Sequence, residues 1–453
     1  MMKQASKKSF HKGISPIRIL PLGYLSVALI GAFLLMLPAA SHGEPLPFFD
    51  ALFTAVSASC VTGLVVVDTG THFTMFGQIV VIVLIQLGGL GFMTAATLLF
   101  RAARRRISLR SRMTLAEAFG EDRLQGIIRL CMSAVKYTFF IEGCGALLLG
   151  IRFVPQFGWH GVWMAVFHSI SAFCNAGFDI MGNFDSLTNY VGDPLVNITI
   201  MALIVFGGLG FTVITELRER KRFSLLSMHA KIVLTGTAFL IFAGAALFLA
   251  FEAGNADTMG GLTAPQKVMA AFFQSVTCRT AGFNTIPQDT LTDASKLLSS
   301  VLMLIGGSPA GTAGGLKVTT VAALLLTAHA CIRNHRDTEA FGRRLSPGSV
   351  RRALCLFMIA CVILFAALIG ITIAEQHTHP DIDVLEFFYE ITSALGTVGL
   401  TAGLTSVAST FTRAVLCALM YLGRAGIMTI ALAIGGRADE STIRYPESNI
   451  LIG

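Results

Sequence analysis

Eight long, continuous apolar segments restrict the fold of this chain more than any other feature of its sequence. A helix needs about 20 mostly apolar residues to cross the hydrocarbon core of a bilayer, and continuous runs differ from the alternating pattern of a membrane β-barrel. Only 13% of the residues are charged, against about 25% in soluble domains. The sequence therefore predicts an all-α polytopic membrane protein and excludes a soluble globule. The predicted spans cover residues 19–37, 75–100, 133–151, 195–215, 229–251, 297–330, 350–374 and 411–435.

Between the two spans of each successive pair lies a shorter apolar stretch that ends near a glycine. A dozen residues cannot cross a bilayer, so we expect each stretch to enter the membrane and return. A second glycine-containing motif follows each of these glycines by 24 to 30 residues. Two motifs that recur four times in order predict four pseudo-repeats of helix, re-entrant pore loop and helix around a central ion pore. The stretches cover residues 48–60, 162–175, 267–279 and 384–396, and their glycines are Gly63, Gly177, Gly282 and Gly399.

The charge distribution assigns the two sides of the membrane. Loops on one side carry 27 lysines and arginines against ten acidic residues, and loops on the other side carry four against fifteen. The positive-inside rule predicts that the first side, with both termini, is cytoplasmic. We expect its basic residues to set the topology and contact anionic lipids, with no nucleic-acid partner. The predicted parts are an N-terminal segment (1–18), pore repeat 1 (19–100), a cytoplasmic linker (101–132), pore repeat 2 (133–217), pore repeat 3 (218–330), a second linker (331–349), pore repeat 4 (350–436) and a C-terminal tail (437–453).

The acidic residues on the predicted external side, among them Asp68, Asp179 and Asp185, allow two interpretations. A negative mouth raises the local concentration of cations by focusing the electric field. A solvated polar rim with no further role fits the sequence equally well, so both interpretations stay open.

The four glycine loops match the requirements of a cation filter, in which backbone carbonyls replace the water shell of the ion. Glycine accepts the backbone angles that turn a carbonyl inward, and it leaves a narrow pore unobstructed. Irregular backbone at membrane depth is tolerated only where it is buried in protein or lines a water-filled cavity. The candidate filter residues are Cys60, Val61, Thr62, Gly63, Cys174, Asn175, Ala176, Gly177, Arg279, Thr280, Ala281, Gly282, Gly396, Thr397, Val398 and Gly399.

The sixth span contains five glycines and Pro309 within residues 306–315, so it cannot stay a regular helix. Its freed backbone groups need water or polar partners, and we expect Ser308 and Thr312 to line a cavity. The glycines within 88–91 and 207–210 are interpreted instead as sites where helices pack closely.

Three basic residues, Arg279, Lys317 and Arg424, fall within the predicted spans or loops, where an ionisable group costs at least about 2.5 kcal/mol on insertion scales. We expect Arg424 to bond carbonyls of the 306–315 loop and hold the ion path closed. A static charge satisfied by helix-end carbonyls is the alternative. Arg279 is expected to brace the third loop, because a cation in the path would repel the permeating ion.

Two other functional classes stay open at this level. Cys60, Cys174 and Cys278 precede three of the loop glycines, which leaves a membrane-embedded redox or metal enzyme as an alternative, although the fourth repeat has no such cysteine. A coupled secondary transporter of another solute is the second alternative. No phosphate-binding loop or dinucleotide fingerprint is present, so control by a nucleotide requires a separate subunit.

Two stretches resemble a known family, the Trk/Ktr/HKT superfamily of potassium transporters. Residues 272–277 with 279–285 are similar to its third pore loop, and residues 306–317 are similar to its intramembrane gating loop. The resemblance extends from about residue 19 to the C-terminus, and eight spans without an additional N-terminal pair resemble the shorter Ktr membrane subunits. The four filter glycines fit potassium selectivity in this family.

The resemblance implies a non-enzymatic protein that takes up potassium across the bacterial plasma membrane, with sodium dependence left open. It further implies a homodimer and a cytoplasmic RCK-type nucleotide-binding regulatory ring such as KtrA, which alone would bind the nucleotide. Ala310 departs from the glycine expected in the gating loop. The residues implied in gating are Gly306, Gly307, Ser308, Pro309, Ala310, Gly311, Thr312, Ala313, Gly314, Gly315, Lys317 and Arg424.

Overall fold

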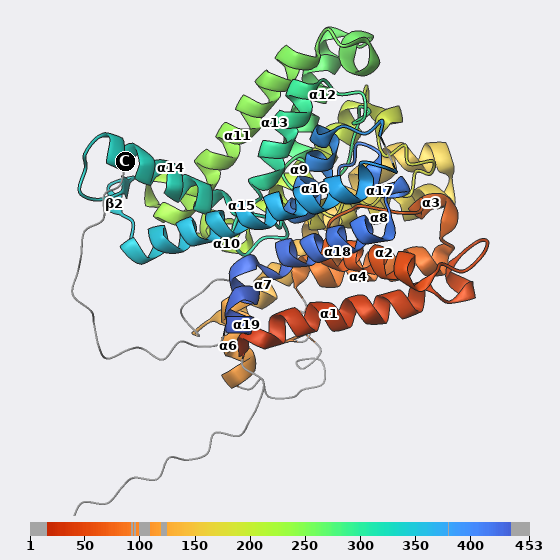
Figure 1. Ribbon diagram of the computed structural model, residues 1–453. Helices are drawn as coiled ribbons and strands as arrows, with labels where there is room; N and C mark the ends of the chain where they lie inside the picture. Colours follow the sequence, from red (N-terminus) through yellow and green to blue (C-terminus); the bar gives the residue numbers. More distant parts are fainter. Residues whose placement is uncertain are drawn as a thin grey trace, which may run out of the picture.

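The computed structural model describes residues 16–91, 94, 97, 98, 109–118, 125–378 and 380–435, and it is a bundle of helices (Figure 1). Residues 1–15 of the predicted N-terminal segment 1–18, the whole predicted tail 437–453 and part of the predicted linker 101–132 lie outside the described residues. The strands found in the described residues are β1 (Glu339–Ala340) and β2 (Arg343–Arg344), which pair as a small antiparallel hairpin. The predicted all-α class is therefore confirmed.

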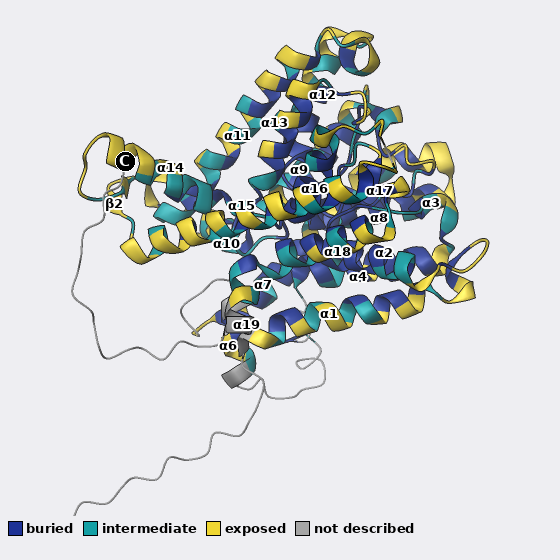
Figure 2. Ribbon diagram, viewed as in Figure 1, coloured by how far each residue is buried: buried dark blue, intermediate teal, exposed yellow. Residues whose placement is uncertain are grey.

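Four helices of the described chain are long and apolar enough to cross a membrane. Their outer surfaces are largely exposed in Figure 2 and carry apolar side chains such as Phe140, Phe239 and Phe365. Exposed apolar surface of this extent fits a chain whose surroundings are lipid tails. The long helices are α1 (Pro16–Leu35), α7 (Ile127–Phe157), α11 (Met228–Glu252) and α15 (Pro347–Glu375), each within a few residues of a predicted span.

A short helix follows each of these long helices and is buried toward its C-terminal end. Each short helix packs against the long helix before it and against a helix of another part of the chain: α2 against α18, α8 against α4, α12 against α9 and α16 against α13. The contacts therefore run in a circle, which closes because α2 meets α18 at the far end of the sequence. These helices are α2 (Phe48–Cys60), α8 (Trp159–Cys174), α12 (Ala264–Thr277) and α16 (Val384–Gly396), close to the predicted short stretches.

After each short helix and its loop, the chain forms another helix of 12 to 16 residues, which we call the second helix. Each second helix ends at or near the predicted glycine motif. We predicted a break in the span 297–330, and the structure also has breaks in the spans 195–215 and 411–435. In the span 75–100, α4 also ends at Leu90, and part of that span lies outside the described residues. The helices are α4 (Met75–Leu90), α9 (Pro194–Gly208) with α10 (Phe211–Arg220), α13 (Asp293–Leu304) with α14 (Val318–Ile332), and α18 (Thr410–Ala425) with α19 (Ile427–Gly435).

The breaks have a local backbone cause. Gly91, Gly210 and Gly426 have φ angles of +81°, +85° and +87°, which end a right-handed helix. At Gly210 the axis turns by 96° between α9 and α10. The predicted close packing is also present, because a β-carbon added to Gly207 would collide with the Phe173 carbonyl at the end of α8. In these motifs, glycine therefore allows close helix packing and also ends or bends the helix.

Polar contacts tie the start of each second helix to the end of the preceding long helix. The Glu252 carboxylate at the end of α11 accepts hydrogen bonds from the backbone N and Oγ1 of Thr292, at 3.0 and 2.6 Å. Glu375 at the end of α15 accepts equivalent bonds from Ser409, at 3.0 and 2.6 Å. Before α4, Thr74 Oγ1 donates to a backbone carbonyl just after α1, at 2.6 Å. Thr292, Ser409 and Thr74 are the N-cap residues of α13, α18 and α4, so each contact fixes the position where a second helix begins.

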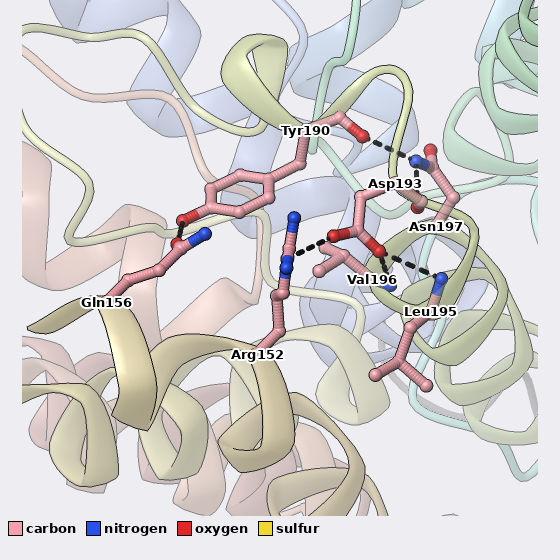
Figure 3. A network of polar contacts seen from close by, with 7 residues as sticks. All are labelled: Arg152, Gln156, Tyr190, Asp193, Leu195, Val196 and Asn197. Carbon is pink, nitrogen blue, oxygen red and sulfur yellow. Dashed lines mark hydrogen bonds and ion pairs between the residues drawn. The ribbon is translucent and has the colours of Figure 1, made fainter.

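The corresponding contact between α7 and α9 is an ion pair, shown in Figure 3. Arg152 Nε lies 2.5 Å from Asp193 Oδ2, and Asp193 also accepts the first N–H groups of α9. Tyr190 donates to Gln156 at 2.5 Å, and the buried Asn197 amide donates to the backbone on either side of the turn. The Arg152 side chain is half exposed, so the ion pair adds little to the free energy of unfolding. Its main effect is to fix where α9 begins relative to α7.

The remaining short elements connect these helices at the two ends of the bundle. They are η1 (Pro38–Ala40), α3 (Thr69–His72), α6 (Leu109–Ala118), η2 (Thr188–Tyr190), η3 (Phe223–Leu225), η4 (Ala256–Gly260) and α17 (Leu404–Val407).

Candidate functional site

Four backbone segments meet in the interior of the bundle, one after each short helix. Each segment contains one of the four loop glycines, and all four glycines have positive φ angles. Glycine adopts this left-handed region without the steric cost that a β-carbon imposes. The φ angles are +97° at Gly63, +70° at Gly177, +83° at Gly282 and +94° at Gly399.

The four glycines follow one another in a closed circle, which we call the glycine ring. A β-carbon added to Gly63 would lie under 3.0 Å from the segment of Gly177, and one added to Gly177 would lie as close to the segment of Gly282. Gly282 approaches Gly399 in the same way, and Gly399 approaches Thr62 and Gly63. Real β-carbons essentially never make such contacts, so this spacing admits only glycine at the four positions.

The residue two positions before each glycine is also left-handed, although none of these residues is itself a glycine. A non-glycine residue in this region costs of order 1–3 kcal/mol, so it persists only where the surrounding structure requires it. The same strained conformation in all four segments indicates that their function depends on backbone geometry. The residues are Val61, Asn175, Thr280 and Thr397, with φ angles of +58°, +59°, +66° and +52°.

The first residue of each predicted filter quartet belongs to a short helix or directs its side chain elsewhere. Cys60, Cys174 and Gly396 are the last residues of α2, α8 and α16. The Arg279 side chain is buried, and its guanidinium donates to a carbonyl of α11 and to Gly306 O, both at 3.4 Å. Through these bonds Arg279 connects the third segment to α11 and to Gly306, which is the kind of contact expected of a bracing residue.

Residues 305–317 form an irregular loop between α13 and α14, as the glycine and proline content predicted. Its backbone N–H groups donate to carbonyls at the end of α9, which have lost their helical donors because the helix breaks there. Ser308 N donates to Gly208 O at 2.9 Å, and Thr312 N donates to Gly207 O at 3.2 Å. The loop and the bend in α9–α10 therefore stabilise each other.

The loop lies directly against the ring segments. The Asn175 side-chain amide lies 3.3 Å from the Thr280 hydroxyl and 3.3 Å from the Thr312 hydroxyl, so it joins the second segment to the third and to the loop. Elsewhere in the loop, a β-carbon on Gly314 would collide with Thr397 in the fourth segment. Moving the loop would therefore break contacts with the segments that carry the glycine ring.

Two basic side chains besides Arg279 bind carbonyls of this loop. The Arg424 guanidinium, at the end of α18, donates to Thr312 O and reaches across to Gly88 O at the end of α4. Lys317 Nζ donates to Ala313 O at 2.7 Å. The expected contact between Arg424 and the loop is present, and it connects the loop to two other helices.

A cavity of about 200 Å³ adjoins the loop, and its lining includes Ala310, Lys317 and Arg424. We expected Ser308 and Thr312 to line a cavity, and neither residue is in the lining of this one. Both side chains are 1% exposed and bond to backbone carbonyls inside the protein, Ser308 at 3.1 Å and Thr312 at 3.1 Å. These two hydroxyls of the irregular loop therefore have acceptors within the protein.

Ala310 occupies a position where a glycine would be free of strain. Its φ angle is +58°, and its carbonyl accepts a hydrogen bond from Phe211 N at 3.0 Å. Alanine in place of the expected glycine therefore keeps the left-handed conformation, at a cost of about 1–2 kcal/mol.

Several acidic residues at the end of the bundle that includes α3 and α17 already have structural partners. The two oxygens of Asp68 each accept a backbone N–H at 2.7 Å. Asp50 pairs with Arg413 at 3.0 Å, and Glu386 pairs with Lys296 at 2.6 Å. These carboxylates therefore hold loops together, which does not decide between the two interpretations of the acidic residues.

The three cysteines considered for an enzyme site are free thiols, all of them buried. Cys174 lies near Glu142 and Cys278 lies near Gln274, with donor–acceptor distances of 3.8 Å in both cases. Cys60, Cys174 and Cys278 share no hydrogen-bonding partner in the part of the chain that the structure describes, and no group of metal-ligating side chains is found there.

Side-chain hydroxyls on the four short helices make one set of contacts with the ring segments that was not predicted from the sequence. The signal is present in the sequence, because a serine lies six residues before three of the glycines and a threonine lies five residues before the other. The residues are Ser57, Ser171, Thr277 and Ser393.

This bundle has apolar helices on its outside and a ring of glycines in irregular backbone at its centre. That combination is typical of a membrane transport protein. Residues 16–435 match the TrkH family, which is described as cation transport proteins. The chain belongs to this family, which confirms the expected membership and points to a transporter rather than an enzyme.

Relatives match over nearly the whole chain. Ktr system potassium uptake protein B of Bacillus subtilis is 40% identical over 440 residues, which cover 97% of each chain. Potassium/sodium uptake protein NtpJ of Enterococcus hirae is 39% identical over 452 residues, which cover 99% of each chain. The crystal structure of the potassium transporter TrkH from Vibrio parahaemolyticus has the same fold, with a TM-score of 0.72 at 17% identity over 95% of this chain and 86% of that chain.

Proposed function

We propose that this protein takes up potassium across the bacterial plasma membrane through the glycine ring. The observation that carries the proposal is the closed circle of four segments, each with a left-handed residue two positions before a left-handed glycine. Such backbone can direct carbonyl oxygens at one axis, where they replace the water shell of a cation. The potassium uptake named for relatives at about 40% identity supports potassium as the cation.

The four segments and their helices act as pseudo-repeats around this axis. The circular packing of the short helices and the four ties between helix ends support that arrangement. The excess of basic residues on one side supports cytoplasmic termini. Uptake needs no hydrolytic site in this chain, because a potential of 100 mV supplies about 2.3 kcal/mol per inward charge.

The loop at 305–317 is the gate of this path. Contacts between the loop and two ring segments, and its bonds to Arg424 and Lys317, support a closed arrangement that must loosen before ions pass. A cytoplasmic nucleotide-binding ring of the KtrA type controls the loop, as the family resemblance implies. Because the Enterococcus hirae relative is a potassium/sodium uptake protein, uptake by this protein should be measured with and without sodium.

The test of the function is rubidium and potassium uptake in a bacterial strain that lacks its own potassium uptake. We expect wild-type protein to restore growth at low potassium and to take up rubidium, with a nucleotide-binding partner co-expressed. Absence of uptake under these conditions would remove the proposal. Saturable uptake of another solute that competes poorly with potassium would favour the secondary transporter instead.

The homodimer is tested by mass. We expect protein extracted with its surrounding lipid to have twice the mass of the chain, because the resemblance implies paired membrane subunits. Native mass measurement at several protein concentrations checks this, and a monomer at every concentration would contradict the dimer.

External pH should change uptake at low potassium through Asp179, two residues after Gly177. Burial, with the neighbouring Asp68 and Asp185 carboxylates, raises the pKa of Asp179 to about 7. Below that pH the side chain is mostly neutral, and above it the negative charge attracts cations to the mouth of the path. We expect the rubidium uptake rate at sub-saturating concentration to rise about twofold between pH 6 and pH 8.

The matched control for this prediction is Asp179→Asn, which keeps the shape of the side chain without its charge. Uptake by this variant should vary less with pH than uptake by the wild type. An equal pH dependence in both proteins would show that another group is responsible.

A further inference from the structure

We propose that four buried hydroxyl groups on the short helices position the carbonyls of the glycine ring and thereby set cation selectivity. The inference rests on the proposed function, because it assigns positioning residues to that filter. All four side chains are 0% exposed, and they come from four different helices. The residues are Ser57 on α2, Ser171 on α8, Thr277 on α12 and Ser393 on α16.

In the first and fourth segments, the hydroxyl accepts the N–H of the ring glycine itself. Gly63 N donates to Ser57 Oγ at 3.1 Å, and Gly399 N donates to Ser393 Oγ at 3.1 Å. The two bonds have the same length and the same spacing of six residues, so they are one arrangement that occurs twice.

These bonds fix the direction of the carbonyl that precedes each glycine. A trans peptide is planar, and its C=O points opposite to the N–H of the next residue. Holding Gly63 N–H toward Ser57 therefore directs Thr62 O away from α2. Thr62 O is the atom closest to the β-carbon position of Gly399 across the ring, so this carbonyl lies where the ring segments meet.

In the second and third segments, the hydroxyl instead donates to the carbonyl just after the glycine. Ser171 Oγ donates to Phe178 O at 2.7 Å, and Thr277 Oγ1 donates to Phe283 O at 2.5 Å. Each bond turns that carbonyl back toward its short helix, so the glycine is fixed from its C-terminal side. Two neighbouring segments are thus held before the glycine and the other two after it.

Each hydroxyl residue holds its segment at a second point through its own backbone carbonyl. This carbonyl accepts the N–H of the residue that precedes the ring glycine, at 2.8 to 3.0 Å. The peptide groups on both sides of that residue are then restrained by one residue of the short helix. The donors are Thr62, Ala176, Ala281 and Val398.

Neighbouring hydroxyls on the same helices provide matched controls. Thr392 is 0% exposed, and its hydroxyl donates to Tyr389 O within α16 at 2.9 Å. Ser59 is also 0% exposed and donates to Val56 O within α2 at 3.2 Å. Both are buried like the positioning residues, but the bonds that they make stay inside their helices.

The experiment compares Ser393→Ala with Thr392→Val in full-length protein reconstituted into liposomes. Rubidium and sodium influx are measured separately, and the ratio of their initial rates reports selectivity independently of the amount of protein inserted. We expect Ser393→Ala to lower the rubidium-to-sodium ratio about fivefold to tenfold, because Gly399 N–H loses its acceptor and the peptide is free to turn. Thr392→Val should keep the wild-type ratio.

Each outcome decides a different question. Equal ratios in wild type and Ser393→Ala, or an equal loss in both variants, would overturn the positioning role while wild-type uptake still supports the proposed function. A wild type without selective rubidium influx would overturn the proposed function itself. The pair Ser57→Ala and Ser59→Ala repeats the comparison on α2 and decides the question if Ser393→Ala does not fold.

Discussion

Potassium-selective uptake is expected to be lost when Gly282 is replaced by aspartate, with rubidium uptake reduced at least about tenfold. The φ angle of +83° disfavours any side chain, and a β-carbon would lie under 3.0 Å from Val398 O and from Gly177 Cα. The neighbouring segments would have to move apart, and the spacing of the ring carbonyls would change. Initial rates of rubidium uptake, with potassium and sodium as competitors, measure both effects in a strain without its own potassium uptake.

The control for this variant is Gly403→Asp. Gly403 has a φ angle of +103°, but no atom lies within 4 Å of its β-carbon position. The Gly403→Asp substitution therefore introduces the same charge and a similar backbone strain, but the new side chain does not contact the ring. Near-wild-type uptake by Gly403→Asp together with loss in Gly282→Asp supports the ring as the filter. Normal rate and selectivity in a correctly inserted Gly282→Asp would contradict the filter assignment.

Basal flux is expected to rise when Arg424 is replaced by alanine in membranes that lack the regulatory partner. The guanidinium bonds to Thr312 O and Gly88 O tie the loop to α18 and α4. Hydrogen bonds from a charged group contribute about 1.5–3 kcal/mol each, and 1.4 kcal/mol changes an equilibrium tenfold. Losing one such bond from a closed gate should raise rubidium flux about tenfold or more.

Arg413→Ala is the matched control for Arg424→Ala, because Arg413 lies on the same helix and pairs with Asp50 far from the loop. We expect its flux to equal that of the wild type. Shortening the 306–315 loop should raise flux as Arg424→Ala does. If both altered proteins insert correctly and flux stays the same or falls, the loop is not the gate, and the Arg424 charge has only a static structural role.

The positions of the long and short helices were predictable because they depend on local composition. A run of about 20 apolar residues spans a bilayer wherever it occurs, and α11 and α15 begin and end within three residues of the predicted spans. The breaks in the second helices were predicted only for the sixth span. The bend between α9 and α10 combines the left-handed Gly210 with hydrogen bonds from Ser308 and Thr312, which lie about a hundred residues away in sequence.

In the candidate filter too, the features that depend on local sequence were predictable, and the contacts between distant residues were not. Glycine at Gly63, Gly177, Gly282 and Gly399 was recognisable because it recurs after each short apolar stretch. The hydroxyls that hold these segments were missed, because a serine within an apolar helix has many ordinary partners in its own helix. Ser57 and Ser59 are two residues apart, yet the Ser57 hydroxyl accepts a bond from the ring segment and the Ser59 hydroxyl donates within α2.

The sequence by itself determined that this chain is a helical membrane protein with four glycine loops and one broken span, since length, apolarity and glycine content act locally. Only the tertiary structure decided that the glycines form a closed ring, that the loop binds Arg424 and the ring segments, and that Ser308 and Thr312 lie outside the adjoining cavity. The physical reason is that buried backbone groups must find partners, and in an irregular segment those partners come from distant parts of the chain.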